Sequence, residues 1–514
     1  MTGVAIAAPS PAAVEAATAV SADGGNAVDA AIAAVCVATV TEFGITGPMG
    51  GGFINVWQPG HEPVVIDANT EMPGRGITAD RLGRGLRRFD FDYFGPVTLY
   101  GGHASVGTPG LFAGLDHAHR RWARLPWHTL INNAAVVARD GFPLGASAAF
   151  WLDRAADHLF GWNAECVDYI RQAPDRSRPV AGQIMRSSDL ARSFETIARD
   201  GVSTLYIGEI AHIIAEDMAA NEGLISREDL AAYRVVERPA LRARIGEYDV
   251  ATNPPPSIGG PVLAACLRTL EHRCTGDRIS AADIIETLRL VLGYRWSVID
   301  LAEDLAEAGS ELIRLLDAEG PQRLSLLSSS PDTVHVSVVD ADGMACSITT
   351  SCGYCSGYIA PGTGLMFNNA LGEAELNRRG FHSMPPGTRI ASNMAPTTAR
   401  TDGGAVLAVG SPGADRITTA LFQVLAALAF DKASLQEAIV HPRIHLAAES
   451  EGIVLRLEAH PAAEKAAQAS GLPVILSEGL TMYFGGVGAA ARDCDGILHA
   501  VGDPRRQAAT AVHL

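Results

Sequence analysis

Thr333 is the residue of this chain with the clearest potential for chemistry. It stands before a predicted strand, Val334 to Val339, and after a Ser-rich segment, LSLLSSSPD, which has no strong tendency to form a helix or strand. A threonine hydroxyl is a poor nucleophile at neutral pH, but a free α-amine on the same residue, with a pKa near about 8, can take its proton. Such an amine exists only if the chain is cut before Thr333. Taken alone, a threonine at this place is typical of an ordinary strand edge.

Other familiar site patterns are absent from the sequence or stand in the wrong context. It has no HExxH, no Walker loop and no GxSxG elbow. His441 and His445 come closest to a metal pair, but Pro442 argues against one helix through both, so we expect no metal and no cofactor. Cys352 and Cys355 form a CxxC in a Gly-containing loop and not at a helix start, which favours two ordinary loop cysteines.

Several short stretches that are weak singly become informative together. In their order and spacing they resemble the gamma-glutamyltransferase family of N-terminal-nucleophile hydrolases, from about Gly24 to about Arg506. The stretches are GGNAVDAA, TGPMGGGF, VGTPGLFAGL, ARDGFPL, LISREDLAAYR, PPPSIGG, DTVHVSVVDADG, PGTGLMFNNAL, SNMAPTT, GSPGADRITT and GDPRR.

The family resemblance implies a precursor that cuts itself before a Thr that opens a strand. The matching residue is Thr333, so the resemblance puts the scissile bond between Asp332 and Thr333. It implies an α+β fold, a four-layer αββα sandwich. We therefore expect a helix-rich large subunit, residues 1–332, and a strand-rich small subunit, residues 333–514, that stay associated as one folded unit.

The resemblance also assigns the other catalytic roles. The family uses the backbone N–H groups of a Gly-Gly pair as an oxyanion hole, and here the pair is Gly413 and Ala414 in GSPGAD. Alanine keeps its N–H, so this function can survive. A second hydroxyl eighteen positions after the nucleophile, normally Thr, is here Ser351.

The substrate-binding positions depart further from the family pattern. The family holds the glutamyl α-carboxylate with an Arg, and the ungapped match puts Asn69 there, with Thr70 at the following Glu. Glu373 replaces the Asp that takes the substrate amine, and Ser392 and Asn393 replace a serine pair. A neutral amide does not replace a bidentate Arg–carboxylate pair.

These departures decide what substrate we expect. The small-molecule partner should carry an amide or related acyl bond and should not be plain glutathione, unless Arg75 or Arg389 reaches the pocket. Three alternatives stay open. They are a hydrolase that cleaves a carbon–carbon bond in an alkylproline-type antibiotic pathway, an ordinary gamma-glutamyl hydrolase or transpeptidase, and an unprocessed scaffold without catalysis.

The elements that must position these residues follow from sequence periodicity. Asn26 is a plausible N-cap with Asp29 in the first turn of an apolar helix that we expect to be buried. From about Arg120 to Gly320 the pattern is mostly helical, and after Pro331 strand-like alternation dominates. That order suits a sheet core covered by helices.

Composition excludes several classes of protein. The chain has 514 residues, 47% hydrophobic and 19% charged, with a net charge of −17, so it is globular and nucleic acid is not an expected partner. Its N-terminal stretch is unlike a secretory signal, and its most apolar helix is too short for a bilayer, so we expect a cytoplasmic protein without membrane contact. Eight cysteines in this length do not form a disulfide framework.

Overall fold

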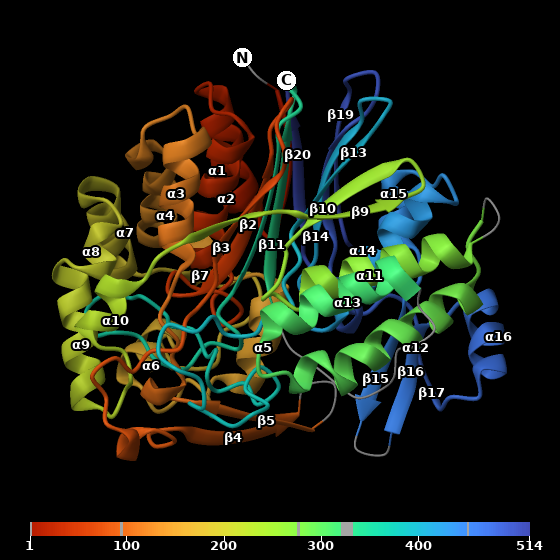
Figure 1. Cartoon of the computed structure of the whole chain (residues 1–514). Helices are drawn as coiled ribbons and strands as arrows, with labels where there is room; N and C mark the ends of the chain where they lie inside the picture. The colour runs from red at the N-terminus through yellow and green to blue at the C-terminus, as the bar shows by residue number, and fades with distance from the viewer. Residues whose placement is uncertain (1–2, 93–95, 275–277, 320–332, 450–451) are drawn as a thin grey trace.

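Two antiparallel β-sheets lie face to face at the centre of the molecule (Figure 1). The computed structural model describes residues 3–92, 96–274, 278–319, 333–449 and 452–514. The strand order of the first sheet is β20 (Ala509–His513), β1 (Val4–Ala8), β11 (Val334–Asp340), β12 (Ala345–Ser351), β2 (Gly51–Trp57), β3 (Val64–Ala68) and β8 (Val236–Pro239). The strand order of the second is β19 (Leu498–Gly502), β18 (Gly488–Arg492), β14 (Val406–Gly410), β13 (Thr397–Thr401), β10 (Tyr248–Thr252) and β9 (Leu241–Ile245).

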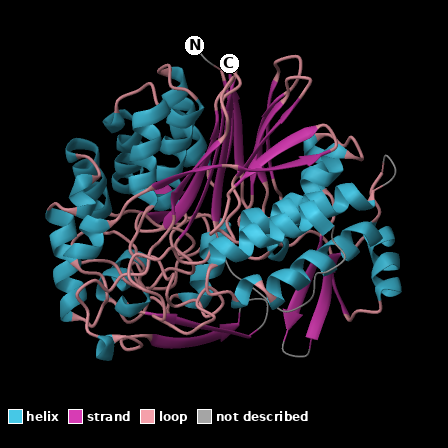
Figure 2. Cartoon of the chain, in the orientation of Figure 1, coloured by secondary structure: helices cyan, strands magenta, loops and turns pink. Residues whose placement is uncertain are grey.

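Helices cover the outer face of each sheet (Figure 2). The first sheet carries α1 (Pro11–Ala22), α2 (Ala27–Thr41) and α3 (Leu111–Trp122), with α4 (Trp127–Asp140) and α7 (Ser188–Asp200) beyond them. The second carries α11 (Gly259–Arg273) and α14 (Arg416–Ala429), with α12 (Ala281–Ser297) and α13 (Leu305–Glu319) outside α11. The predicted four-layer αββα sandwich is therefore confirmed.

Shorter elements surround this frame. The remaining helices are α5 (Ala146–Ala155), α6 (Ala164–Ile170), α8 (Ser203–Tyr206), α9 (Glu209–Ala220), α10 (Arg227–Ala232), α15 (Leu435–Val440) and α16 (Pro461–Ser470). The remaining strands are β4 (Arg87–Asp92), β5 (Pro96–Gly101), β6 (Phe142–Pro143), β7 (Ile184–Met185), β15 (Ile444–Glu449), β16 (Gly452–Glu458) and β17 (Val474–Ser477).

The central helix α2 forms as its sequence predicts. The Asn26 side chain accepts hydrogen bonds from the backbone N–H groups of Val28 and Asp29, and the Asp29 carboxylate accepts from the Asn26 N–H. This capping box satisfies N–H groups that have no partner inside the helix. All fifteen residues of α2 are buried, in line with the apolar pattern. The helix packs on β11 and β12, the hairpin that follows Thr333.

Both sheets draw strands from both sides of Thr333. In the first sheet β1, β2, β3 and β8 precede it and β11, β12 and β20 follow it, and in the second sheet β10 pairs with β13. Any fragments made by a cut before Thr333 would share hydrogen-bonded strands, so separating them would break both sheets. Sequence periodicity did not predict β8, β9 and β10, because short strands such as VERP and LRARI are polar and contain Arg and Pro.

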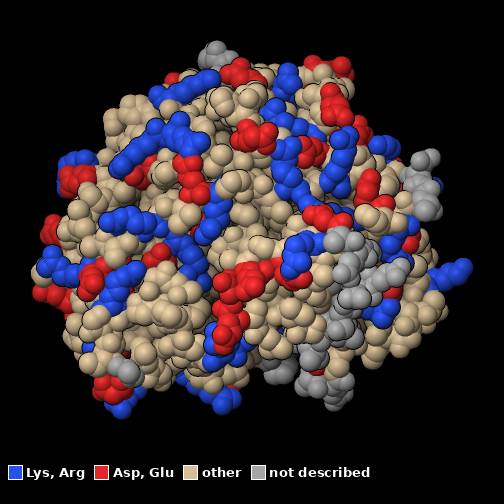
Figure 3. All heavy atoms as spheres, viewed as in Figure 1, with Lys and Arg blue, Asp and Glu red and all other residues tan. Residues whose placement is uncertain are grey.

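The surface of the described residues carries charges of both signs. On the face in Figure 3, Lys and Arg side chains are interspersed with Asp and Glu. Within the described ranges no helix combines the length and apolarity that crossing a membrane requires.

Candidate active site

One pocket brings together seven of the residues that the sequence singled out. It has a volume of about 440 Å³. The predicted residues that line it are Asn69, Thr70, Thr333, Ser351, Glu373, Ser392 and Asn393. The other lining residues are Cys352, Gly353, Asn368, Ala370, Leu376, Ala391 and Met394. Most of these residues lie in loops or at strand ends, where side chains are free to converge on one place.

Thr333 stands directly before β11 and is buried, with 3% of its surface exposed. It lines the pocket on one side and a second cavity of about 450 Å³ on the other. Its hydroxyl-bearing side chain therefore lies between two cavities. Asp332, the predicted residue on the other side of the scissile bond, lies outside the described residues.

The spacing of eighteen residues between Thr333 and Ser351 has a geometric cause. In the β11–β12 hairpin Val334 pairs with Thr350, and extending this register by one residue puts Thr333 opposite Ser351. Directly opposed residues in an antiparallel pair have Cα atoms about 4.5–5.5 Å apart. The Ser351 hydroxyl accepts a hydrogen bond from the Gly353 N–H at 2.8 Å, which holds its side chain at the strand end.

The second cavity beside Thr333 contains groups that sequence reasoning missed. Glu42, His335, Pro412 and Arg506 line it together with Thr333. Burial raises the pKa of Glu42 to about 7, against the opposing effects of Arg506 and of a hydrogen bond from Thr41. No motif around Glu42 marked it, because a carboxyl's environment is a tertiary property.

His335 is not available as a base in this cavity. Burial lowers its pKa to about 3, so the imidazole is neutral at physiological pH. Its Nδ1 lies 2.9 Å from the Thr349 hydroxyl and its Nε2 lies 2.6 Å from the Ser337 hydroxyl, so both ring nitrogens already have partners.

The predicted oxyanion pair lies in a tight loop between β14 and α14. Gly413 and Ala414 both have positive φ, 122° and 61°. Neither lines the pocket, but Pro412, the residue before them, lines the second cavity beside Thr333. A Cβ on Gly413 would come within 2.8 Å of the Gly485 Cα, so only glycine fits there. Gly413 and Ala414 thus directly follow a residue that lines the same cavity as Thr333. Their role as an oxyanion hole stays a prediction.

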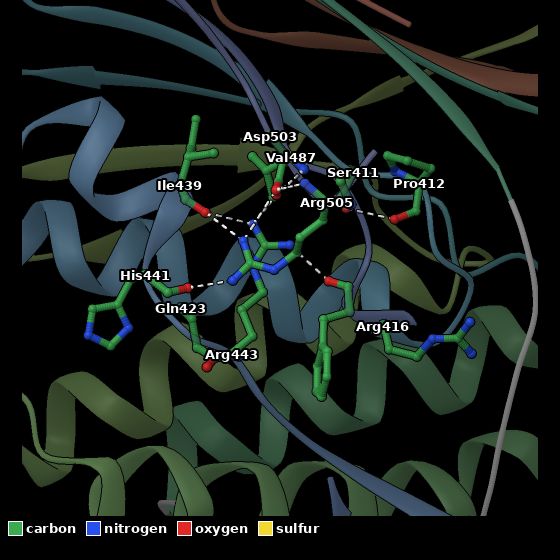
Figure 4. A network of polar contacts seen from close by, with 12 residues as sticks. Ser411, Pro412, Arg416, Gln423, Ile439, His441, Arg443, Val487, Asp503 and Arg505 are labelled. Atoms are coloured by element: carbon green, nitrogen blue, oxygen red, sulfur yellow. Dashed lines mark hydrogen bonds and ion pairs between the residues drawn. The ribbon is translucent and has the colours of Figure 1, made fainter. Parts of the chain in front are cut away.

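A buried ion network supports this loop (Figure 4). Asp503, from the GDPRR motif, accepts hydrogen bonds from the Arg443 guanidinium at 2.5 Å and from the Val487 N–H at 2.9 Å. Arg443 also donates to the Phe484 carbonyl at 2.8 Å. The segment between Phe484 and Val487 in turn touches the loop, because the Gly486 N–H donates to the Ser411 hydroxyl at 3.1 Å. The GDPRR motif therefore acts on the loop through Phe484–Val487.

Asn69 stands at the position where the family has an arginine, and its side chain already forms a hydrogen bond. The Asn69 Nδ2 donates to the Ile390 carbonyl at 2.8 Å. Among the described residues no Lys or Arg lines the pocket. The acyl side of the pocket thus offers a neutral amide in place of a cation.

The two arginines that could have rescued a carboxylate site are committed elsewhere. Arg389 donates to Asp67 at 3.1 Å and to Glu71 at 2.5 Å, and its guanidinium lies over the Tyr233 ring. Arg75 forms an ion pair with Asp229 at 3.2 Å. Neither residue lines the pocket. Both guanidinium groups are thus paired with carboxylates, although Arg389 lines the larger neighbouring cavity, and their part in substrate binding stays a prediction.

Glu373 is the carboxyl side chain among the described residues that line the pocket, and it is 3% exposed. It packs closely on Gly353, where a Cβ would come within 1.9 Å of the carboxylate. Burial and the nearby Glu373 and Asp415 raise the pKa of Glu375, which lies behind it. Two carboxyl groups so close cannot both carry charge cheaply, so we expect Glu375 to be protonated.

The cysteine and histidine pairs behave as ordinary structural residues. Cys352 and Cys355 are buried free thiols, and burial together with Cys352 raises the pKa of Cys355. His445 lies in β15 against Asp415 at 3.5 Å and Thr419 at 3.1 Å, whereas His441 ends α15. Within the described ranges no group of three or more His, Cys, Asp or Glu residues could hold a metal ion.

Comparison with known proteins matches nearly the whole chain to one family. A family model described as gamma-glutamyltranspeptidase matches residues 13–513. The "Acylase ACY 1 proenzyme" of Pseudomonas sp. strain SE83 is 31% identical over 503 residues, covering 92% of this chain and 87% of the relative. The "Glutathione hydrolase proenzyme" of Pseudomonas aeruginosa is 30% identical over 481 residues, covering 86% and 83%.

Solved structures agree on the fold. A crystal structure of cephalosporin acylase from Bacillus halodurans superimposes with a TM-score of 0.81, covering 99% of this chain and 96% of that one. The two sequences are 21% identical, so this likeness concerns the fold alone.

Proposed function

Because the chain belongs to the gamma-glutamyltranspeptidase family, we propose that it is a self-cleaving enzyme whose nucleophile is Thr333, made N-terminal by the cut, and whose substrate carries an amide or related acyl bond. The observation that carries this proposal is the pocket itself. Thr333 lies at the mouth of β11, opposite Ser351 and in the same cavity as the five positions that correspond to the family's substrate-binding residues.

The chemistry uses the two functional groups of one residue. After cleavage the Thr333 Oγ attacks the acyl carbon, and its proton passes to the Thr333 α-amine, whose pKa is near about 8. The leaving group takes that proton and departs, leaving an ester on Thr333. Water, or an amine acceptor, then attacks the ester and restores the free hydroxyl. The Gly413 and Ala414 N–H groups are proposed to stabilise the oxyanion that forms when Thr333 is acylated and again when the ester is cleaved.

The acyl pocket favours substrates other than a gamma-glutamyl compound. A glutamyl group brings an α-carboxylate that must leave water, which costs several kcal/mol unless a cation meets it. Asn69 already donates to Ile390, and both Arg75 and Arg389 are paired with carboxylates outside the pocket. The relatives include an enzyme named as an acylase as well as one named as a glutathione hydrolase, and the pocket chemistry favours the acylase type.

A neighbouring cavity can receive the rest of the substrate. It has a volume of about 1150 Å³, against about 440 Å³ for the pocket, and the two share Leu376 and Ala391 in their walls. Its lining combines apolar residues such as Ile258, Leu305 and Met384 with charged residues, among them Asp300, Glu303, Arg378 and Arg389. We propose that the acyl group enters the smaller pocket and that a larger, mainly apolar leaving group lies in the bigger cavity.

A gel and a substrate panel test this function. Purified protein should run as two fragments on a denaturing gel, and sequencing of the smaller one should begin at Thr333. A single band near 53.8 kDa would instead favour a scaffold without catalysis. Assay of gamma-glutamyl, oxamyl and aliphatic acyl amides on the processed protein then distinguishes an acylase from a glutathione hydrolase.

A further inference from the structure

A buried arginine lies directly behind the acyl pocket. Arg295, near the end of α12, is 3% exposed. Its Nη2 donates to the Asn393 Oδ1 at 2.7 Å and its Nε lies 3.3 Å from the Asp300 carboxylate. Its Nη1 has no hydrogen-bond partner within the described residues. Asp300 is also paired with Arg378 at 3.3 Å, so Arg295 has only part of one carboxylate to balance its charge.

This contact determines how the Asn393 amide is oriented. An arginine side chain can only donate hydrogen bonds, so the atom of Asn393 that faces it must be the oxygen. The Asn393 Nδ2 is therefore directed away from Arg295. Asn393 lines the pocket, so its two N–H donors are left for whatever the pocket holds.

Ser392, next to Asn393, also presents a hydrogen-bond donor. The Ser392 carbonyl accepts from the Ile258 N–H at 2.9 Å, and the Ser392 hydroxyl oxygen accepts from the Met394 N–H at 3.2 Å. The Ser392 O–H is then available as a donor. The Ser392–Asn393 end of the pocket thus offers donors.

We propose that Arg295 is a positioning residue: it holds the Asn393 amide so that the pocket selects acyl groups with a hydrogen-bond acceptor oxygen at their far end. The inference rests on the proposed function and adds to it the chemical class of the acyl group. Without Arg295 the amide can turn over, and its oxygen would then face the acyl oxygen and repel it. The charge of Arg295 also lies near Asp415 and stabilises the charged form of that carboxyl.

Binding of two matched amides tests the proposal directly. The probes are 5-oxohexanamide and hexanamide, which differ by one carbonyl oxygen, and dissociation constants are measured by calorimetry on the processed protein. Wild type should bind the oxo compound about tenfold more tightly, the value of one good hydrogen bond. Arg295→Met should bring the two constants to within about twofold, and Arg295→Lys should restore part of the difference.

Two further variants distinguish a positioning role of Arg295 from a general effect on folding. Asn393→Asp keeps an acceptor for Arg295 but has no donor for the pocket, so it should lose the preference while the protein still folds and cuts itself. Arg289→Met removes an exposed arginine of the same helix, paired with Glu286, and should keep the tenfold preference.

The outcomes are distinct. Equal binding of the two amides by wild type, no measurable binding of either, or an unchanged preference in either Arg295→Met or Asn393→Asp would overturn the role of Arg295. A wild-type protein that stays in one piece would overturn the proposed function instead. Should Arg295→Met fail to fold, Arg295→Lys decides, because it keeps the charge without the guanidinium fork and should show a preference below that of wild type.

Discussion

Two parts of the pocket are built in different ways: the nucleophile side, with Thr333 and Ser351, and the acyl side, with Asn69, Glu373 and Asn393. Thr333 and Ser351 face each other because they occupy opposed positions of one hairpin, so backbone hydrogen bonds alone bring them together. Asn69, Glu373 and Asn393 come from three separate loops and act through side chains that are oriented by Ile390, Gly353 and Arg295.

This difference explains how such a pocket can change substrate without losing its chemistry. Replacing a side chain on a loop alters what the pocket binds, whereas the register of the hairpin is unaffected. In the sequence match, the positions predicted to be catalytic keep the family's hydroxyl and backbone groups, and the positions predicted to bind substrate do not. The following experiments act on one side at a time.

The largest effect is expected on the nucleophile side. Thr333→Ala removes the hydroxyl that attacks the preceding peptide bond, so the chain should remain uncut and inactive. A denaturing gel and N-terminal sequencing check this. Thr510→Ala, an exposed threonine of β20 in the same sheet, should be processed like wild type. Processing of the Thr333→Ala protein would show that another residue opens the bond.

On the acyl side, wild type should be a poor gamma-glutamyl enzyme. Compared with an analogue that lacks the α-carboxylate, gamma-glutamyl-p-nitroanilide should have a kcat/KM lower by about 30- to several thousand-fold, because no charge-assisted bidentate pair receives it.

Asn69→Arg should recover part of that loss, and Asn69→Met, of similar length and without charge, should not. If wild type instead prefers the glutamyl compound and Asn69→Arg adds nothing, glutathione becomes the leading substrate.

Within the nucleophile side, the loop after β14 should be sensitive at one residue and tolerant at the next. Gly413→Ala puts a Cβ within 2.8 Å of the Gly485 Cα at a φ of 122°, so the loop must move and kcat should fall by about 10²-fold. Ala414→Gly keeps the N–H and relieves a positive φ, so its kcat should stay near wild type. Equal kcat values in the two variants would place the oxyanion hole elsewhere.

The smallest effect concerns pH, in the cavity on the other side of Thr333. Burial raises the pKa of Glu42 from 4.5 to about 7, so the folded protein binds more protons than the unfolded chain between these pH values, and this group's contribution to stability falls as pH rises through them. Glu42→Gln should therefore raise the free energy of unfolding by about 1–3 kcal/mol at pH 8 and change it little at pH 4.5.

Denaturant unfolding at the two pH values checks this. Glu15→Gln, an exposed carboxyl of α1, should show no such pH dependence. A Glu42→Gln protein with the same pH dependence as wild type would mean that Glu42 titrates normally.

The sequence by itself determined the fold, the helix cap at Asn26 and seven of the fourteen residues that line the pocket, because motif order and local hydrogen bonding depend on neighbouring residues along the chain. It did not predict β8 and β9, short polar segments that become strands by pairing at a sheet edge, or β10, which lies between β9 and β13. The raised pKa of Glu42, the pairing of Arg389 with Asp67 and the contact from Arg295 to Asn393 were decided by tertiary structure alone. Each depends on groups far apart in sequence that meet where water is excluded, and there the direction of a single donor or charge sets the chemistry.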